Sequence, residues 1–223
     1  MKICHYLLLM MISAGTALGQ QGERVALGTS WGDAHVRVID ERGLRGFTAS
    51  NTLGTISLER KQTRQGAFGQ LHIEGYISSN KPGYPALPVR TELIEVPPGA
   101  AVRVEIMGYD EQVISLSDYQ IRNQVMPAQP PAVKNLSDSI RPFHFKSSVY
   151  RSDQFVEDTL VRVEEIGMLR NTRLARLKIK PFHYNPVSNQ LKVFKNLRFR
   201  VRFPDDGLKS TPDPSGDDNP YFS

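Results

Sequence analysis

The C-terminal part of the sequence has the pattern that most constrains the fold, a strict alternation of apolar and cationic side chains. Its apolar members are Leu197, Phe199, Val201 and Phe203, and its cationic members are Arg198, Arg200 and Arg202. Successive side chains of a β-strand point to opposite faces of its sheet, so this period of two predicts a strand with one buried and one solvated face. A helix would instead repeat its apolar residues about every 3.6 positions.

An earlier stretch has the same pattern, with apolar Ala175, Leu177 and Ile179 alternating with cationic Arg176, Lys178 and Lys180. Between the two stretches, Tyr184–Gln190 contains Asn-Pro and Ser-Asn, which are typical of a turn. We therefore predict a β-hairpin in which 175–180 pairs with 197–203 and presents a cationic face to solvent. We interpret that face as solvated surface and not as a binding patch, because cationic side chains on strands also discourage aggregation.

Further strands are predicted from shorter runs at His35–Ile39, Thr52–Arg60, Gln70–Tyr76, Val89–Val96 and Ala101–Tyr109. The last two flank the turn Pro97–Ala100, so we expect them to pair, with Val102, Val104 and Ile106 on a core. The polar, Gly-rich segment Gln20–Gly32 is predicted to be a flexible entry. No segment has a sustained helical period with a cap at each end. The predicted fold class is therefore all-β, an antiparallel β-sandwich or partly open barrel with long Pro-rich loops.

Residues Met1–Gly19 have the composition of a secretory signal peptide. Lys2 is followed by the apolar run Tyr6–Ile12 and by the small-residue cleavage site Ala17-Leu18-Gly19. Cleavage there leaves 204 of the 223 residues, and no later run approaches the roughly 18 apolar residues of a membrane span. We expect a protein exported through the inner membrane, then periplasmic or at the cell surface. The one cysteine, Cys4, lies in the predicted signal, which excludes a disulfide framework and a cysteine nucleophile from the mature residues.

Several function classes find no support in the sequence. The formal net charge of +5 is small, and the basic residues are interspersed with acidic ones, so we do not expect a nucleic-acid partner. The sequence has no G-x-S-x-G, H-E-x-x-H or phosphate-loop motif, and its histidines are isolated, so no catalytic site, metal or cofactor is predicted. From position 204 onward the chain is acidic and rich in Pro, Gly and Ser. We predict a domain over 20–203 and a linker over 204–223.

The segment Pro127–Arg141 interrupts the strands with three closely spaced prolines and no apolar period, so it is predicted to be an extended surface loop. At its centre Lys134 follows Val133 and precedes Asn135. An extended segment that offers one long cationic side chain has the shape of a protease substrate. The alternative, which composition alone favours, is an ordinary solvated lysine.

An ordered set of segments carries a resemblance to a known family. These segments are Pro85–Arg90, Leu93–Ala100, Glu111–Tyr119, Met126–Pro130, Val163–Arg170, Pro181–Pro186, Asn189–Val193 and Asn219–Phe222. Together they resemble the N-terminal propeptide of gingipain-type cysteine endopeptidases, the lysine-specific kind more than the arginine-specific kind. The resemblance implies a secreted propeptide that packs against the catalytic domain, keeps the enzyme latent and assists its folding.

The same resemblance implies a role for the loop. Alignment on Met126-Pro127 and on Arg141-Pro142-Phe143 places Lys134 in the specificity pocket of the enzyme, with Val133 and Asn135 flanking it. A lysine ammonium that meets a pocket carboxylate makes a charge-assisted contact, and a loop that is already extended loses little entropy on docking. The implied partner is the catalytic domain, in cis or in trans, which the given residues do not contain. The sequence is then either a fragment of a longer precursor or a stand-alone inhibitor.

Two further expectations accompany this interpretation. The alternative function is a cell-surface β-sandwich adhesion or carbohydrate-binding module, which would need an aromatic platform exposed on one sheet. The single Trp31, in the predicted flexible entry, offers little for stacking. In addition, Asp138-Ser139-Ile140 and Asp158-Thr159-Leu160 match the Asp-Ser/Thr-apolar pattern of O-glycosylation in the bacterial group of this family, so Ser139 and Thr159 are predicted sites.

Overall fold

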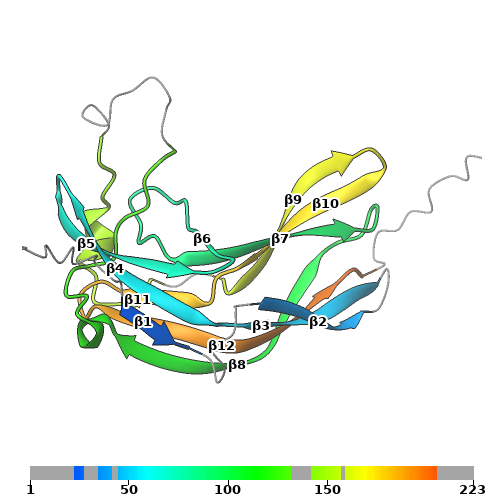
Figure 1. The fold of residues 1–223 in the computed structure, drawn as a ribbon. Helices are drawn as coiled ribbons and strands as arrows, with labels where there is room; N and C mark the ends of the chain where they lie inside the picture. Colours follow the sequence, from blue (N-terminus) through cyan, green and yellow to red (C-terminus); the bar gives the residue numbers. More distant parts are fainter. Residues whose placement is uncertain (1–22, 28–34, 42–44, 132–141, 157–158, 205–223) are drawn as a thin grey trace, which may run out of the picture.

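Strand β12 (Gln190–Arg202) organises the fold of the computed structural model (Figure 1). One edge of β12 pairs first with β11 (Phe182–Asn185) and then with β3 (Gly46–Thr52). The other edge pairs with β8 (Arg103–Ser115), and β2 (His35–Glu41) continues the sheet beyond β3. The structure describes residues 23–27, 35–41, 45–131, 142–156 and 159–204. The predicted signal peptide lies outside the described residues, and so does the predicted linker except for its first residue.

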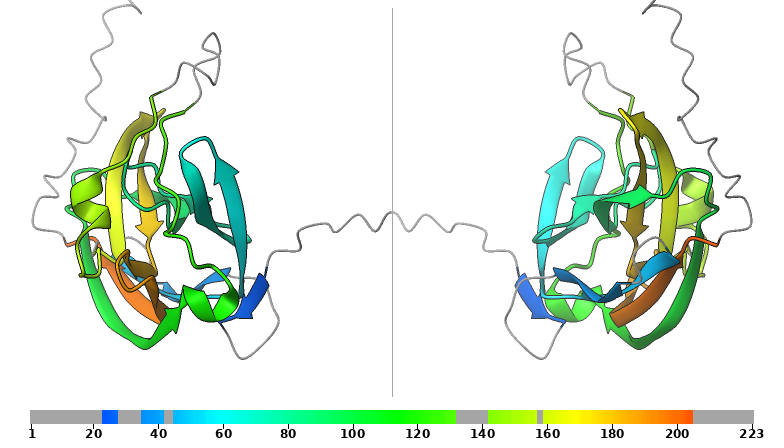
Figure 2. Two further views of the ribbon diagram at one scale, coloured as in Figure 1. Left: turned by 90° about the vertical axis from the view of Figure 1, so that its left-hand side faces the viewer. Right: turned by 90° about the vertical axis from the view of Figure 1, so that its right-hand side faces the viewer.

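Two smaller sheets complete the architecture. A four-stranded sheet contains, in spatial order, β6 (Ile77–Ser78), β7 (Pro88–Val96), β10 (Thr172–Ile179) and β9 (Val161–Leu169). A three-stranded sheet contains β1 (Glu23–Ala26), β4 (Thr55–Thr63) and β5 (Gly66–Ile73). Every pair of these named strands is antiparallel. The predicted all-β class is therefore confirmed, and the facing sheets form a sandwich, not a closed barrel (Figure 2).

The alternating pattern of β12 fills two clusters of buried side chains. Leu197, Phe199 and Val201 are all 0% exposed and pack against β9 and β10. The other half of β12 contributes Leu191 and Val193 to a second cluster with β1, β4 and β5. Each such side chain contributes about 1.5–3 kcal/mol relative to an exposed one.

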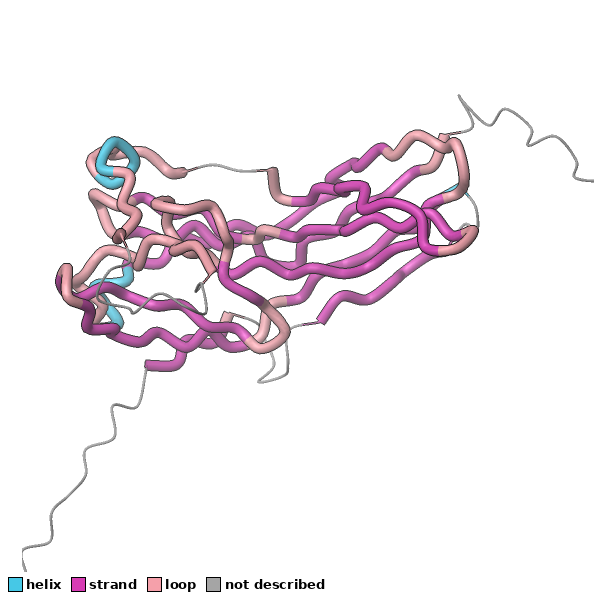
Figure 3. Tube along the Cα trace, turned by 90° about the horizontal axis from the view of Figure 1, so that it is seen from above, coloured by secondary structure: helices cyan, strands magenta, loops and turns pink. Residues whose placement is uncertain are grey.

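Figure 3 shows strands running toward one end of the molecule and most described loops gathered at the other, with the short helices η2 (Leu116–Tyr119) and α1 (Ser147–Tyr150).

The predicted hairpin of 175–180 with 197–203 is wrong in its pairing. The first of these segments forms β10, which pairs with β7 and β9 in the other sheet. Pro181 has no amide donor, and after it the chain enters the five-stranded sheet as β11. The turn was correctly located, because the Asn185 side chain accepts hydrogen bonds from the amides of Val187 and Ser188 at 3.0 and 3.2 Å. The hairpin at that turn joins β11 to β12.

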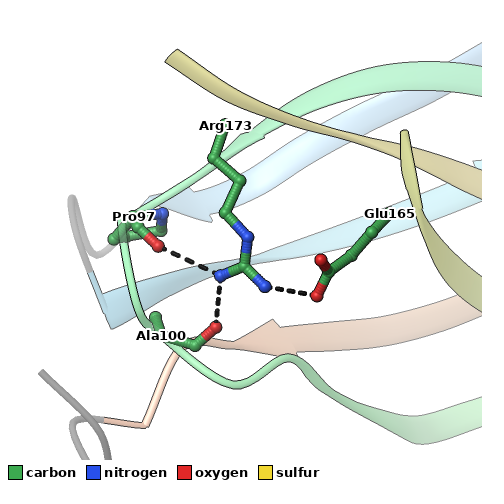
Figure 4. Close-up of polar contacts among 4 residues, drawn as sticks. All are labelled: Pro97, Ala100, Glu165 and Arg173. Atoms are coloured by element: carbon green, nitrogen blue, oxygen red, sulfur yellow. Dashed lines mark hydrogen bonds and ion pairs between the residues drawn. The ribbon is translucent and has the colours of Figure 1, made fainter. Parts of the chain in front are cut away.

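The predicted pairing of β7 with β8 is also wrong, because the two strands belong to different sheets. The turn Pro97–Ala100, which connects β7 to β8, is held by Arg173. Its guanidinium donates to the carbonyl oxygens of Pro97 and Ala100 at 3.3 and 2.6 Å (Figure 4). The same guanidinium pairs with Glu165. Val102, Val104 and Ile106, at and just before the start of β8, were predicted to face a core. Val102 and Val104 do so, whereas Ile106 is 39% exposed.

Several strands were not predicted, and β3 and β1 show why. Strand β3 buries Thr48 and Asn51 beside Ala49, so its sequence lacks an apolar alternation. The Tyr76 hydroxyl donates to Asn51 Oδ1 at 2.7 Å, which partly satisfies this buried amide. Strand β1 lies in the segment predicted to be a flexible entry, and Val25 is buried there. One or two buried apolar residues are enough to hold a short strand, but too few to show a period.

Candidate functional site

The loop singled out from the sequence is described only at its two ends. Lys134, Val133 and Asn135 lie outside the described residues, and so does Ser139. The structure describes the segments on either side, which we call the entry stem, 121–131, and the exit stem, 142–150. How firmly these stems are held determines how well the protein can present the loop between them.

The entry stem is bonded to protein on both sides, like an additional strand. On one side the Gly69 amide donates to the Gln124 carbonyl oxygen at 2.9 Å, and the Met126 amide donates back to the Gly69 carbonyl oxygen at 2.8 Å. On the other side the bonds, 2.9 and 2.8 Å long, run from the Ala86 amide to the Met126 carbonyl oxygen and from the Ala128 amide to the Tyr84 carbonyl oxygen. The stem therefore enters the loop in a fixed, extended conformation.

Two buried tyrosines hold the backbone of Val125 from below. The Val125 amide donates to the Tyr184 hydroxyl at 3.1 Å, and the Tyr150 hydroxyl donates to the Val125 carbonyl oxygen at 2.8 Å. Tyr184 donates in turn to Asn189 Oδ1 at 2.7 Å, and Asn189 Nδ2 donates to the Ile121 carbonyl oxygen at 2.6 Å. Burial raises the pKa of both tyrosines above the ordinary value, so both phenols remain protonated donors.

The side chain of Gln129 joins the two stems directly. Its Nε2 donates to the His144 carbonyl oxygen at 2.9 Å, and its Oε1 accepts from the His144 amide at 3.0 Å. The same Nε2 also donates to the Pro127 carbonyl oxygen at 3.0 Å. This two-way contact, which we call the Gln129 clamp, closes the segment 130–143 at its base.

A second connection between the stems passes through the turn at Gly83. The Gly83 amide donates to the Ala128 carbonyl oxygen at 2.9 Å, and the Lys146 amide donates to the Gly83 carbonyl oxygen at 3.0 Å. Gly83 has a φ of +80°, and a Cβ there would lie 3.1 Å from the Lys146 nitrogen. Both the left-handed backbone and the close approach therefore favour glycine.

Tyr84 lies beside this turn between two lysines. Lys146 Nζ donates to the Tyr84 hydroxyl at 2.7 Å, and Lys81 Nζ lies 3.7 Å from the centre of the ring. The hydrogen bond from Lys146, followed by that from Lys81, lowers the pKa of the Tyr84 phenol. The exit stem is packed as well, because Phe143 meets Phe68 at 5.7 Å and Phe145 stacks on Tyr150 at 4.4 Å between ring centroids.

The residues that hold the stems were not predicted individually from the sequence. Gln129 lies inside the predicted Pro-rich loop, and Gly83 and Tyr84 lie in another proline-rich stretch. The available signal was proline density, since proline favours extended geometry without donating a bond of its own. Thr159 is exposed just before β9, and its glycosylation stays a prediction.

The described residues offer little for the other classes of site. Their exposed aromatic rings, Tyr109 and Phe145, lie on different elements, and each packs against a neighbouring ring. No group of three or more His, Asp or Glu side chains within the described part is arranged to hold a metal ion. None of its helices is long and apolar enough to cross a membrane. The geometry defines a β-sandwich that holds the two stems on either side of residues 132–141, an arrangement suited to presenting a loop.

Comparison with known proteins identifies the family. The sequence profile of the Propeptide_C25 family matches residues 33–213. Lys-gingipain HG66 and Lys-gingipain W83, both from Porphyromonas gingivalis, are 35% identical over 157 residues, or 70% of this chain. The chain spans only 9% of the length of these curated relatives. It belongs to the Propeptide_C25 family, and the resemblance inferred from its sequence is confirmed.

Two solved structures share the fold. One, concerned with the zymogenic latency of gingipain K from P. gingivalis, matches with a TM-score of 0.76 and 31% identity, covering 82% of this chain and 99% of that one. The other, a complex of the pro- and mature domains of P. gingivalis RgpB, matches with a TM-score of 0.65 and 16% identity, covering 77% and 84%. The chain is therefore a gingipain propeptide that is more similar to the lysine kind than to RgpB.

Proposed function

We propose that this chain keeps a lysine-specific gingipain-type cysteine endopeptidase latent by occupying its active site with residues 133–135. The observation that carries the proposal is the double attachment of the stems, through the Gln129 clamp and through Gly83. A loop whose two ends are already fixed loses less conformational entropy when it docks than a free peptide does. The scaffold therefore supports inhibition by a short contact.

In this mechanism Lys134 enters the specificity pocket, and Val133 and Asn135 lie along the substrate cleft on either side. The pocket of a lysine-specific enzyme must offer a negative group, because an ammonium transferred from water without a partner is strongly unfavourable. The charge-assisted contact between them is stronger than a neutral hydrogen bond. Lys134 thus supplies most of the specificity, while the β-sandwich supplies the position.

The partner in this proposal is the catalytic domain, joined in cis through the segment 204–223 or bound in trans. The parent precursor would be a secreted enzyme, whereas these residues act as its inhibitor. Folding assistance follows from the same binding, because a ligand that binds only the native state of the enzyme shifts its folding equilibrium toward that state. The signal peptide Met1–Gly19 would direct the precursor across the inner membrane.

The experiment is a titration of residues 20–223 against two mature enzymes, one lysine-specific and one arginine-specific gingipain-type endopeptidase. We expect competitive inhibition of the lysine-specific enzyme, at least about tenfold tighter than that of the other, because Lys134 meets a pocket shaped for lysine. Inhibition that substrate does not relieve would place the contact outside the active site. Equal inhibition of both enzymes would remove Lys134 as the source of specificity.

A further inference from the structure

The described residues contain seven lysines, and their backbone settings differ sharply. Four of them lie within strands, where the backbone is paired: Lys61, Lys178, Lys192 and Lys195. Two others, Lys81 and Lys180, are each followed by proline. Proline lacks the N–H and fixes φ, so a Lys-Pro bond is a poor peptidase substrate. Among the described lysines, Lys146 alone is outside a strand and not followed by proline.

Lys146 is nevertheless held at each group that a peptidase would need. Its amide donates to the Gly83 carbonyl oxygen at 3.0 Å. Its carbonyl oxygen accepts from the amides of Val149 and Tyr150 at 3.0 and 3.3 Å, at the start of helix α1. Its Nζ donates to the Tyr84 hydroxyl at 2.7 Å and lies 4.7 Å from the centre of that ring.

A lysine-specific endopeptidase binds an extended substrate, with the lysine side chain in a pocket and the carbonyl oxygen in an oxyanion hole. In the folded chain the Lys146 carbonyl oxygen belongs to a helical turn, and its ammonium belongs to Tyr84. Cleavage therefore requires local opening of the exit stem, and its rate follows the population of the opened form.

We infer that the Lys146–Ser147 bond is a latent processing site for a lysine-specific endopeptidase, shielded by Tyr84 until the exit stem opens. The reaction is hydrolysis: the bond between the Lys146 carbonyl carbon and the Ser147 nitrogen breaks. Water supplies a hydroxyl to that carbon and a proton to that nitrogen. That the enzyme in question is the propeptide's own partner rests on the proposed function.

Cleavage at this bond would change how the loop is held. Lys146 would no longer be continuous with α1, so the stack of Phe145 on Tyr150 and the bonds to the helical turn would no longer constrain the exit stem through the chain. The Gln129 clamp, the bond from the Lys146 amide to the Gly83 carbonyl oxygen and the contact of Phe143 with Phe68 would remain on the upstream fragment. The exit stem would then be held by these contacts alone, at a free chain end, so the loop would be fixed less firmly at its exit and docking would cost more conformational entropy. The site is thus placed to convert a tight inhibitor into a weaker one.

The test uses residues 20–223 carrying Lys134→Ala, so that no cut at position 134 loosens the exit stem. The chain is treated with a lysine-specific serine endopeptidase unrelated to gingipains, and mass spectrometry follows the fragment that begins at Ser147. Compared with this background, Tyr84→Phe should raise the rate of that cut about fivefold, because it removes the acceptor of the lysine ammonium and keeps the ring. Tyr109→Phe, at an exposed tyrosine on β8, is the matched control and should leave the rate unchanged. Lys146→Gln should abolish the fragment.

Each outcome either supports or overturns the inference. Equal rates for Tyr84→Phe and Tyr109→Phe would overturn it, as would faster cutting at a strand lysine such as Lys61 than at Lys146. If Tyr84→Phe weakens the whole fold, cuts at strand lysines rise in proportion, and the unchanged ratio of the Lys146 cut to the Lys61 cut counts against the shielding. The readout needs no gingipain, so its failure is separate from failure of the proposed function, which an inhibition assay reports.

Discussion

The hydroxyl of Tyr184 is the central polar atom beneath the entry stem, and removing it is the sharpest test of the scaffold. Tyr184 is 0% exposed, and its oxygen accepts from the Val125 amide and donates to Asn189 Oδ1. Tyr184→Phe keeps the ring and its packing, but leaves that amide and that amide oxygen without their partner. We therefore expect the substitution to reduce stability and to loosen the entry stem.

The magnitude follows from the two groups left unpaired. A buried donor or acceptor that loses its partner costs about 1–3 kcal/mol, so the expected loss for the two groups is about 2–6 kcal/mol. This is a large part of the roughly 5–15 kcal/mol that stabilises a typical domain. Tyr150→Phe leaves only the Val125 carbonyl oxygen without its donor, so the loss expected for this variant is about half as large.

Urea denaturation of residues 20–223 measures both losses. We expect a lower midpoint with an unchanged dependence on urea, because the surface exposed on unfolding is the same. Tyr109→Phe serves as the surface control and should change stability by less than about 0.5 kcal/mol. A loss below about 1 kcal/mol for Tyr184→Phe would refute the reasoning, since it would mean that the Val125 amide and Asn189 Oδ1 find other partners.

Three further outcomes are expected. Gln129→Ala should weaken inhibition of the mature enzyme about threefold to tenfold and leave the urea midpoint unchanged. The reason is that its bonds to His144 are exposed and hold the ends of the loop without contributing to the core. A shifted midpoint would contradict this. Gly69→Ala should lower stability by about 1–3 kcal/mol in a thermal melt, because the new Cβ would lie 2.6 Å from Ile121 Cγ2; a neutral result would mean that this methyl moves freely. Burial raises the pKa of Tyr76 to about 12, above its ordinary value of 10.0. The unfolded chain therefore loses that proton first, so stability should be constant below about pH 10 and fall above it. Tyr76 should contribute about 1.4 kcal/mol per pH unit up to about pH 12, measured as the difference between the wild type and Tyr76→Phe, because Tyr150 and Tyr184 also have pKa values raised by burial and add to the total fall. An equal pH dependence of the wild type and Tyr76→Phe would argue against the burial of Tyr76.

The sequence predicted features that arise from neighbouring residues. The alternation at Leu197–Phe203 predicted a strand with one fully buried face, and the side chain of Asn185 fixes a turn within the predicted turn segment. The partner of each strand was not predictable in this way, because β10 is amphipathic enough to pair with either sheet. Strand β3 was missed because Asn51 and Thr48 occupy buried positions where a periodic strand would have apolar residues.

The same distinction between local features and long-range contacts applies to the candidate site. The density of prolines in the segment 127–141 was evident in the sequence, whereas its exposure and the role of Lys134, which came from the family resemblance, stay predictions. The contacts that hold the stems join residues far apart in the chain, such as Val125 with Tyr184 and Gln129 with His144. Nothing in the local pattern of a glutamine or tyrosine shows which distant backbone group it will bind.

The inhibition constant of Lys134→Ala tests the central proposal most directly. Residues 20–223, as wild type, Lys134→Ala and Lys134→Arg, are titrated against a mature lysine-specific gingipain-type endopeptidase, with thermal melts to confirm that all three fold. A pocket carboxylate left without its cation typically costs about 2–5 kcal/mol, so alanine should weaken inhibition about 30-fold to 5000-fold, and arginine should weaken it less. Equal inhibition constants for wild type and Lys134→Ala would contradict the account, and latency would then have to come from the wider surface of the β-sandwich.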